Sequence, residues 1–196
     1  MRRRSLVGAA ALVALGLFAV PPDPAASAAA SPLRARLLRA DQLPAGWRAE
    51  ASSGVAGPAT GCLSPRRVLP PPAATASALF SHGGVPQLLE SLSSYRSFGA
   101  RAFAEAVVRL DACHAVRVAA SRAPVTVHVR RISFPRLGDQ SAAYALSFPP
   151  SGIFSVADFL VVRRGDLALV LIEMGVDATA LRHFARFAAR AVADLS

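Results

Sequence analysis

The order of strands and helices along the chain predicts an α+β fold, in which an antiparallel β-sheet carries two main helices and one disulfide. A strand and a helix come first, then several strands joined by hairpin-like turns, and then a second helix. Connections this short exclude the parallel crossovers of a βαβ fold. The run "LALVLIEM" is apolar at both odd and even positions, which predicts a strand in mid-sheet with both faces covered.

Two segments have helical periodicity. In "GARAFAEAVVRLDAC", residues 99–113, apolar side chains such as Phe103 and Leu110 recur on one face. On the opposite face, Arg101, Glu105 and Arg109 follow one another at intervals of four residues. The second helix begins after Asp177, an N-cap residue type. Its predicted core-facing residues are Leu181, Phe184, Ala188, Val192 and Leu195.

The strands are predicted from alternation of apolar and polar residues. They cover "SALFSHGG", "PQLLESLSSYRSF", "PVTVHVRRISF", the stretch around Tyr144, and "FSVADFLVVRRGDLALVLIEMG", where a turn over 164–166 makes two strands. In the third of these, Val127 and Val129 share one parity, whereas Ile132 has the other. A β-bulge at residues 130–131 is the economical explanation for that slip.

The N-terminus has the features of an export signal. Arginines precede an apolar stretch over residues 6–20, and Ala26-Ser27-Ala28 fits a small-residue cleavage site. We therefore expect a signal peptide over 1–28 cleaved near Ala28, an exposed arm over 29–40 and a single domain over 41–196. Sec and twin-arginine export both remain open. The apolar stretch is too short to span a bilayer comfortably, so we expect a secreted or extracytoplasmic protein with no transmembrane segment in its mature part.

The charge pattern argues against nucleic acid as the partner. The formal net charge is +10, and all 22 basic residues are arginine. These arginines are scattered, and no basic run is interleaved with stacking aromatic residues. The surplus instead predicts a solvated surface of mixed charge.

Cys62 and Cys113 are the two cysteines, and both fall in the exported part, where thiols can oxidise. A Cys62–Cys113 disulfide would tie the first helix to the loop that follows Trp47. Two free buried thiols, or a bridge to another molecule, are the alternatives.

No catalytic or metal-binding constellation is visible. "SHGG" resembles an esterase oxyanion segment, but no G-x-S-x-G elbow accompanies it, and a turn explains it. The four histidines have no metal-ligand spacing, so no metal and no cofactor are expected. The letters R-G-D at 164–166 are good hairpin chemistry and need no adhesive role.

The candidate ligand-binding residues are aromatic and arginine side chains. The one tryptophan, Trp47, follows the turn in "DQLPAGW", where it either packs on the sheet edge or forms the wall of a ligand cleft. Guanidinium groups suit carboxylate or phosphate, although solvated arginines at strand ends are the common case. The candidate set is Trp47, Tyr95, Arg131, Arg163 and Arg164.

Several short motifs resemble the PknH-like extracellular sensor-domain family of actinobacterial secreted proteins and lipoproteins. They are "LPAGW", a cysteine some way on, a helix closing on "LDAC", and the hairpin "VVRRGDLALVL" before an amphipathic helix. The resemblance, over about residues 33–195, implies a mixed α/β domain with a cleft for an unidentified ligand and no catalytic activity. The sequence departs from the kinase sensors by having one possible disulfide and no kinase segment.

These observations lead to an expected function. We expect an exported, monomeric, non-catalytic binding or sensor-like domain for an envelope small molecule, lipid or glycan. The alternative is an interaction module that docks a protein through Arg163 and Arg164, and a secreted hydrolase ranks last.

Overall fold

The computed structural model describes residues 32–51, 72–95, 99–118, 124–149, 154–177 and 183–195. A short 3-10 helix, η1 (Ala40–Gln42), comes before two α-helices, α3 (Gly99–Asp111) and α4 (Phe184–Ala193). The strands are β1 (Trp47–Glu50), β2 (Ala74–His82), β3 (Gln87–Ser94), β4 (Ala115–Val118), β5 (Val125–Ile132), β6 (Gln140–Ser147), β7 (Val156–Arg164) and β8 (Leu167–Gly175).

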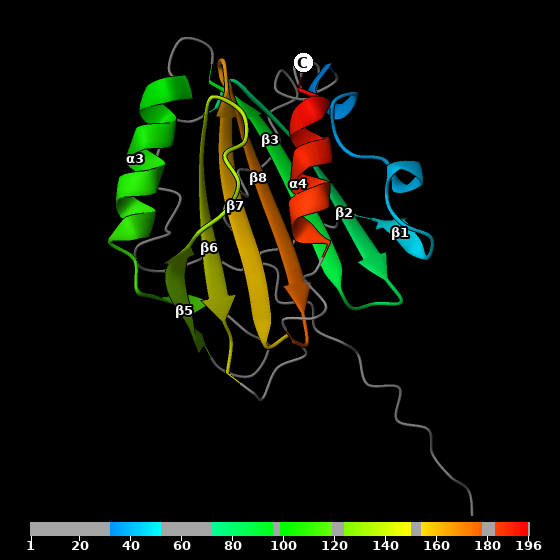
Figure 1. The fold of residues 1–196 in the computed structure, drawn as a ribbon, viewed down its shortest axis with the longest axis vertical. Coiled ribbons are helices and arrows are strands. Elements are labelled where there is room, and N and C mark those ends of the chain that lie inside the picture. The colour runs from blue at the N-terminus through cyan, green and yellow to red at the C-terminus, as the bar shows by residue number, and fades with distance from the viewer. Residues whose placement is uncertain are drawn as a thin grey trace, which may run out of the picture.

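All eight strands join one antiparallel sheet in the order β1-β2-β3-β8-β7-β6-β5-β4. The last hairpin, β7–β8, is therefore inserted beside β3 in the middle of the sheet, while β1 and β4 are the edges (Figure 1). The predicted turn at residues 164–166 is confirmed, since β7 ends at Arg164 and β8 starts at Leu167.

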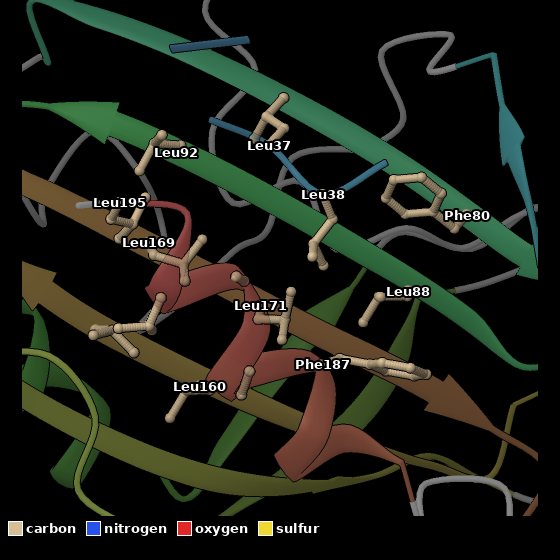
Figure 2. Packing of buried hydrophobic residues seen from close by; sticks show 14 of the residues in the cluster. Leu37, Leu38, Phe80, Leu88, Leu92, Leu160, Leu169, Leu171, Phe187 and Leu195 are labelled. Atoms are coloured by element: carbon tan, nitrogen blue, oxygen red, sulfur yellow. The ribbon is translucent and has the colours of Figure 1, made fainter. Parts of the chain in front are cut away.

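The two helices cover opposite faces of the sheet. On the α3 face, Phe103 and Leu110 pack with Tyr144, Phe159 and other residues of β5 to β8. On the α4 face, the side chains of α4 pack with alternate residues of the same central strands (Figure 2). The predicted two-sided coverage of the central strand is thereby confirmed: in β8, Ile172 faces α3, whereas Leu171 faces α4. The predicted core residues of the second helix that the structure describes, Phe184, Ala188, Val192 and Leu195, are all buried.

The predicted β-bulge in β5 is wrong. Residues 128–132 pair with residues 147–143 of β6 without interruption. Val127 and Val129 face α3, and Ile132 packs against the core on the α4 side. The apolar residues therefore change from odd to even positions because the buried face of β5 changes along the strand. The first part of β5 is covered on the α3 face, and its end is covered on the α4 face.

The N-terminal arm also differs from expectation. Leu33, Leu37 and Leu38 are buried in the core of the α4 face, with Trp47 and the α4 side chains. The Arg36 guanidinium Nη1 donates to the carbonyl oxygen of Leu195 at 3.2 Å, which joins the two ends of the described chain. The segment 33–38 is therefore part of the domain, not an exposed leader to it. The expected signal peptide, residues 1–28, lies outside the described residues.

The predicted fold class, α+β with two main helices and one disulfide, needs correction. The described chain is dominated by the eight-stranded sheet, and its helices are short: 3, 13 and 10 residues in η1, α3 and α4. Their role is to cover the sheet, which supplies most of the core. The expected Cys62–Cys113 disulfide depends on Cys62, which lies outside the described residues; Cys113 is buried at the end of α3. Within the described ranges, no helix is long and apolar enough to span a membrane.

Candidate functional site: buried carboxyl groups on the α4 face

Trp47 lies on the α4 face at the β1 edge, opposite His82 of β2. Its indole meets the Phe187 ring of α4 edge-on, with centroids 5.3 Å apart, and the His82 ring at 6.1 Å. Only 8% of Trp47 is exposed. Two roles were predicted for Trp47, packing on the sheet edge and forming the wall of a cleft. In the structure its indole packs between the sheet edge and α4.

Tyr95 and Arg131 lie on the opposite, α3 face. Tyr95 is buried with Ala102 and Ala168. Arg131 is exposed and forms an ion pair with Asp111 at the end of α3. The hydroxyl of Tyr144 donates to the same Asp111 carboxylate at 2.8 Å. Arg131 therefore helps to attach α3 to the sheet.

Arg163 and Arg164 have intramolecular partners at the β7–β8 hairpin. Arg163 forms an ion pair with Asp139 at 3.1 Å, and its Nε donates to the Gln140 side chain at 2.8 Å. Arg164 Nη1 donates to the carbonyl oxygen of Val192 at the end of α4, at 3.3 Å. Both side chains thus support the fold, and no contact in the described structure favours them as a docking surface.

The candidate residues predicted from the sequence do not meet in one place. Trp47 pairs with His82, at one end of β2. Arg164 lies at the other end: the cross-strand pairs lead from Arg164 to Leu167, then to Ser94 and finally to Ala74 of β2. Ala74 and His82 are eight residue steps apart along β2, so the separation along the strand is about 26 Å. Tyr95 and Arg131 are further separated by the thickness of the sheet.

Two glutamates on the α4 face were not among the candidate residues predicted from the sequence. Glu90 of β3 and Glu173 of β8 are both 0% exposed, within a face whose other buried side chains are apolar. The backbone N–H of Leu38 donates to Glu90 Oε2 at 2.7 Å, and Glu90 Oε1 has no partner. Neither carboxyl oxygen of Glu173 has a hydrogen-bond partner in the described structure. Such groups are rare, because an unpaired charge is costly to bury.

Burial raises the pKa of both glutamates well above the ordinary value of a carboxyl group. Desolvation raises the pKa of Glu90 to about 7, although the Leu38 N–H opposes this and Asp194 adds to it. Desolvation and the nearby Asp158 raise the pKa of Glu173 to about 8. Burial also raises the pKa of Asp158. For Glu90 and Glu173, the fully buried pair, burial thus favours the protonated form, since a charge there would have little solvent.

Glu173 stands at the inner end of a row that crosses the sheet. Cross-strand pairing places Glu173 opposite Asp158, Asp158 opposite Ala145, and Ala145 opposite Arg130. Directly opposed residues share a face, so the row runs along the α4 face from the buried Glu173 to the exposed Arg130. We call the uncovered outer part of this face the open shelf; it consists of Asp158, Ala145, Ser147, Arg130 and His128, which are half-buried or exposed.

The open shelf carries charges of both signs without internal pairing. The side chains of Asp158 and Arg130 have no hydrogen bond or ion pair with another residue that the structure describes, although both residues pair through their backbones in the sheet. The methyl group of Ala145 is the side chain between them in the row. Among the described residues, no group of three or more histidine, cysteine, aspartate or glutamate side chains could hold a metal ion.

A sequence signal for these acids did exist. Glu173 interrupts "LALVLIEM", and Glu90 interrupts "LLESL", both of which are otherwise apolar or small. An acid inside a strand predicted to be covered on both faces indicates a buried carboxyl group. Pairing between Glu173 and Asp158 could not have been predicted, because it depends on the register of β7 and β8.

Comparison with known proteins supports the fold alone. No protein family and no curated protein matches the chain. The extracellular domain of PknH from Mycobacterium tuberculosis matches in structure, with a TM-score of 0.50 at 8% sequence identity. The chain resembles it in fold. The match covers 62% of this chain and 63% of that one, so it spans less than two thirds of the PknH domain. The resemblance predicted from the sequence is confirmed at this level.

Proposed function

We propose that this chain is an extracytoplasmic, non-catalytic binding domain of the PknH-like sensor type, with the open shelf as its ligand-binding surface. The observation that carries the proposal is Asp158, a half-buried carboxyl group without a partner in the described structure, beside the buried and unpaired Glu173. Unpaired polar groups at a partly covered surface are typical of binding sites.

The fold and the leader sequence support the location. The N-terminal 28 residues have the order of an export signal, and the fold resembles a domain described as extracellular. The absence of a catalytic motif from the sequence favours binding over turnover. Arg130 and His128 at the outer end of the shelf suit anionic or hydroxyl groups, while Asp158 suits cationic groups or hydroxyl donors. A polar envelope molecule such as a glycan or a lipid headgroup fits this surface.

The experiment is a binding titration followed residue by residue. Envelope lipid and glycan fractions are added to the isotope-labelled mature protein, and amide chemical shifts are recorded. We expect saturable shifts at Ala145 and Ser147, with binding weakened about tenfold or more by Asp158→Asn or Arg130→Gln, because each change removes a charge-assisted contact.

The matched controls are Arg101→Gln and Glu105→Gln, which remove one charge of each sign from the outer side of α3. Both should bind as the wild type does. Saturable shifts confined to other surfaces would remove the shelf from the proposal, and no saturable shift with any fraction would count against a binding function.

A further inference from the structure

The α4 face combines two features that usually exclude each other: a closely packed apolar core and two fully buried glutamates. Glu90 lies in the row of Leu171 and Leu160, and Glu173 lies in the next row, beside Leu88. Figure 2 shows Leu88, Leu171 and Leu160 beneath α4, with Phe187 close to Leu88. The segment 33–38 and α4 therefore rest on a surface that contains two ionisable groups.

Glu90 interacts with both elements that cover this face, by a hydrogen bond to one and electrostatically with the other. Its Oε2 accepts a hydrogen bond from the Leu38 N–H, in the N-terminal segment. Asp194, at the end of α4, lies close enough to disfavour ionisation of Glu90. Asp194 in turn accepts a hydrogen bond from the Gln42 side chain at 2.9 Å. An additional negative charge on Glu90 would therefore repel Asp194 at the end of α4, while it would strengthen the hydrogen bond from the Leu38 N–H.

The neighbouring charges do not neutralise the two glutamates. Directly opposite Glu90 in the sheet are Ala78 and Leu171, and directly opposite Glu173 are Leu88 and Asp158. Three arginines in the surrounding elements interact with other groups. Arg36 and Arg164 donate to the carbonyl oxygens of Leu195 and Val192, and Arg39 forms an ion pair with Asp41. On this side of the sheet, the further titratable or charged groups are His82, His183, Arg186, Arg130 and His128; Arg186 contacts the His183 ring at 2.7 Å.

We propose that Glu90 and Glu173 make the packing of α4 on the sheet depend on pH; we call these two residues the pH-responsive seat of α4. When both carboxyl groups are neutral, α4 and residues 33–38 pack on the sheet. When the groups ionise, the buried charges can be hydrated only if this cover loosens, since both carboxyl groups are fully buried in an apolar face and neither has a cationic partner in the described structure. The α3 face, on the other side of the sheet, stays closed. This device concerns the fold itself and holds whichever ligand the open shelf binds.

The raised pKa values determine the pH range over which the packing of α4 changes. Glu90 ionises near pH 7 and Glu173 near pH 8 while α4 is packed. With the cover open, both would ionise near their ordinary value of 4.5. Loosening of α4 and residues 33–38 therefore becomes more favourable as the pH rises from 4.5 to about 8. The reason is that the open form releases its protons at lower pH than the packed form. Mildly alkaline conditions release the cover, and mildly acidic conditions close it.

Hydrogen exchange of the full mature chain tests the proposal. Amide protection in α4 and α3 is compared between pH 6 and pH 9, after correction for the intrinsic dependence of exchange on pH. We expect protection in α4 to fall by about tenfold or more, while protection in α3 changes much less. Trp47 emission should shift over the same range, because its indole packs against Phe187 of α4.

The variant that decides the matter is Glu90→Gln/Glu173→Gln, which keeps the side-chain shape and cannot ionise. It should keep α4 protected at pH 9, whereas the exposed substitution Glu105→Gln should behave as the wild type does. Equal loss of protection in α3 and α4 of the wild-type protein would overturn the proposal even if the double variant failed to fold. So would a folded double variant that kept the wild-type pH dependence of α4.

Discussion

The Trp47 indole lies edge-on against the Phe187 ring, with 5.3 Å between the ring centroids. This contact connects the β1 edge of the sheet to α4, two elements that are 140 residues apart in the chain. Aromatic pairs in this geometry add to the stability gained from burial alone. The contact also makes the one tryptophan of the chain a natural reporter of how α4 is seated.

Phe187→Ala should destabilise the protein by about 3 to 4 kcal/mol, because it removes a buried ring and leaves a cavity beside Trp47. Urea unfolding followed by circular dichroism gives the free energy, and Trp47 emission should move to longer wavelength as water reaches the indole. Ala189→Gln, at an exposed position of the same helix, is the control and should change neither. Unchanged emission in Phe187→Ala would mean that the contact does not form in solution.

Tyr144→Phe tests how α3 is attached to the sheet. The Tyr144 hydroxyl donates to Asp111 at 2.8 Å, and Arg131 pairs with the same carboxylate. Loss of the hydroxyl should cost about 1 kcal/mol, the ordinary net value of a hydrogen bond. Arg131→Gln should cost less, between about 0 and 1 kcal/mol, since the ion pair is exposed to solvent.

A double-mutant cycle between Tyr144→Phe and Asp111→Ala isolates the contact. The coupling free energy from urea unfolding should be about 0.5 to 1.5 kcal/mol. Additive effects of the two substitutions would show that the hydroxyl and the carboxylate do not interact in solution.

Gly138→Ala should be more disruptive than Gly165→Ala, although both glycines have positive φ, 59° and 58°. A Cβ at residue 138 would come within 2.6 Å of the Arg163 carbonyl oxygen, whereas a Cβ at residue 165 would meet no atom within 4 Å. Left-handed backbone alone costs roughly 1 to 2 kcal/mol for a residue with a Cβ, so Gly165→Ala should lose about this much and Gly138→Ala clearly more. Equal losses in thermal unfolding would contradict the close approach at residue 138.

The two-sided coverage of the central strands explains which parts of the fold the sequence could predict. Helix α3 and the β7–β8 hairpin follow from local periodicity and turn chemistry, and both are where they were expected. The bulge in β5 was a wrong interpretation, because alternation rules assume one buried face. In β5, Val129 and Ile132 are covered by different helices, which a single strand sequence does not reveal.

The candidate site was less predictable, since it depends on register. Arg163 and Trp47 are chemically suitable for a ligand, but one is paired with Asp139 and the other packs on Phe187. The row from Glu173 to Arg130 exists because β8, β7, β6 and β5 are neighbours in the sheet, and the two outer members are 43 residues apart in the chain. No local pattern joins them.

Glu90→Gln should change how stability depends on pH. The folded-state pKa of Glu90 is raised from 4.5 to about 7, so its stabilising contribution is complete below pH 4.5 and is lost as pH rises through 7. Within that window one such group lowers the free energy of unfolding by up to about 1.4 kcal/mol per pH unit. Glu173 contributes a second slope, which extends to about pH 8.

Urea unfolding of wild type and Glu90→Gln at intervals from pH 4.5 to 8.5 measures the difference. The amide oxygen of the variant can still accept the Leu38 N–H, so the two proteins should have similar stability at pH 4.5. By pH 8 the variant should be more stable by about 1 to 3 kcal/mol, because it never buries a charge. Glu105→Gln, which removes an exposed partner of Arg101 on α3, should lose about 0.5 kcal/mol or less at every pH. A Glu90→Gln profile parallel to that of the wild type would mean that Glu90 ionises without cost in the folded protein, and that its carboxyl group is not buried in solution as it is in the structure.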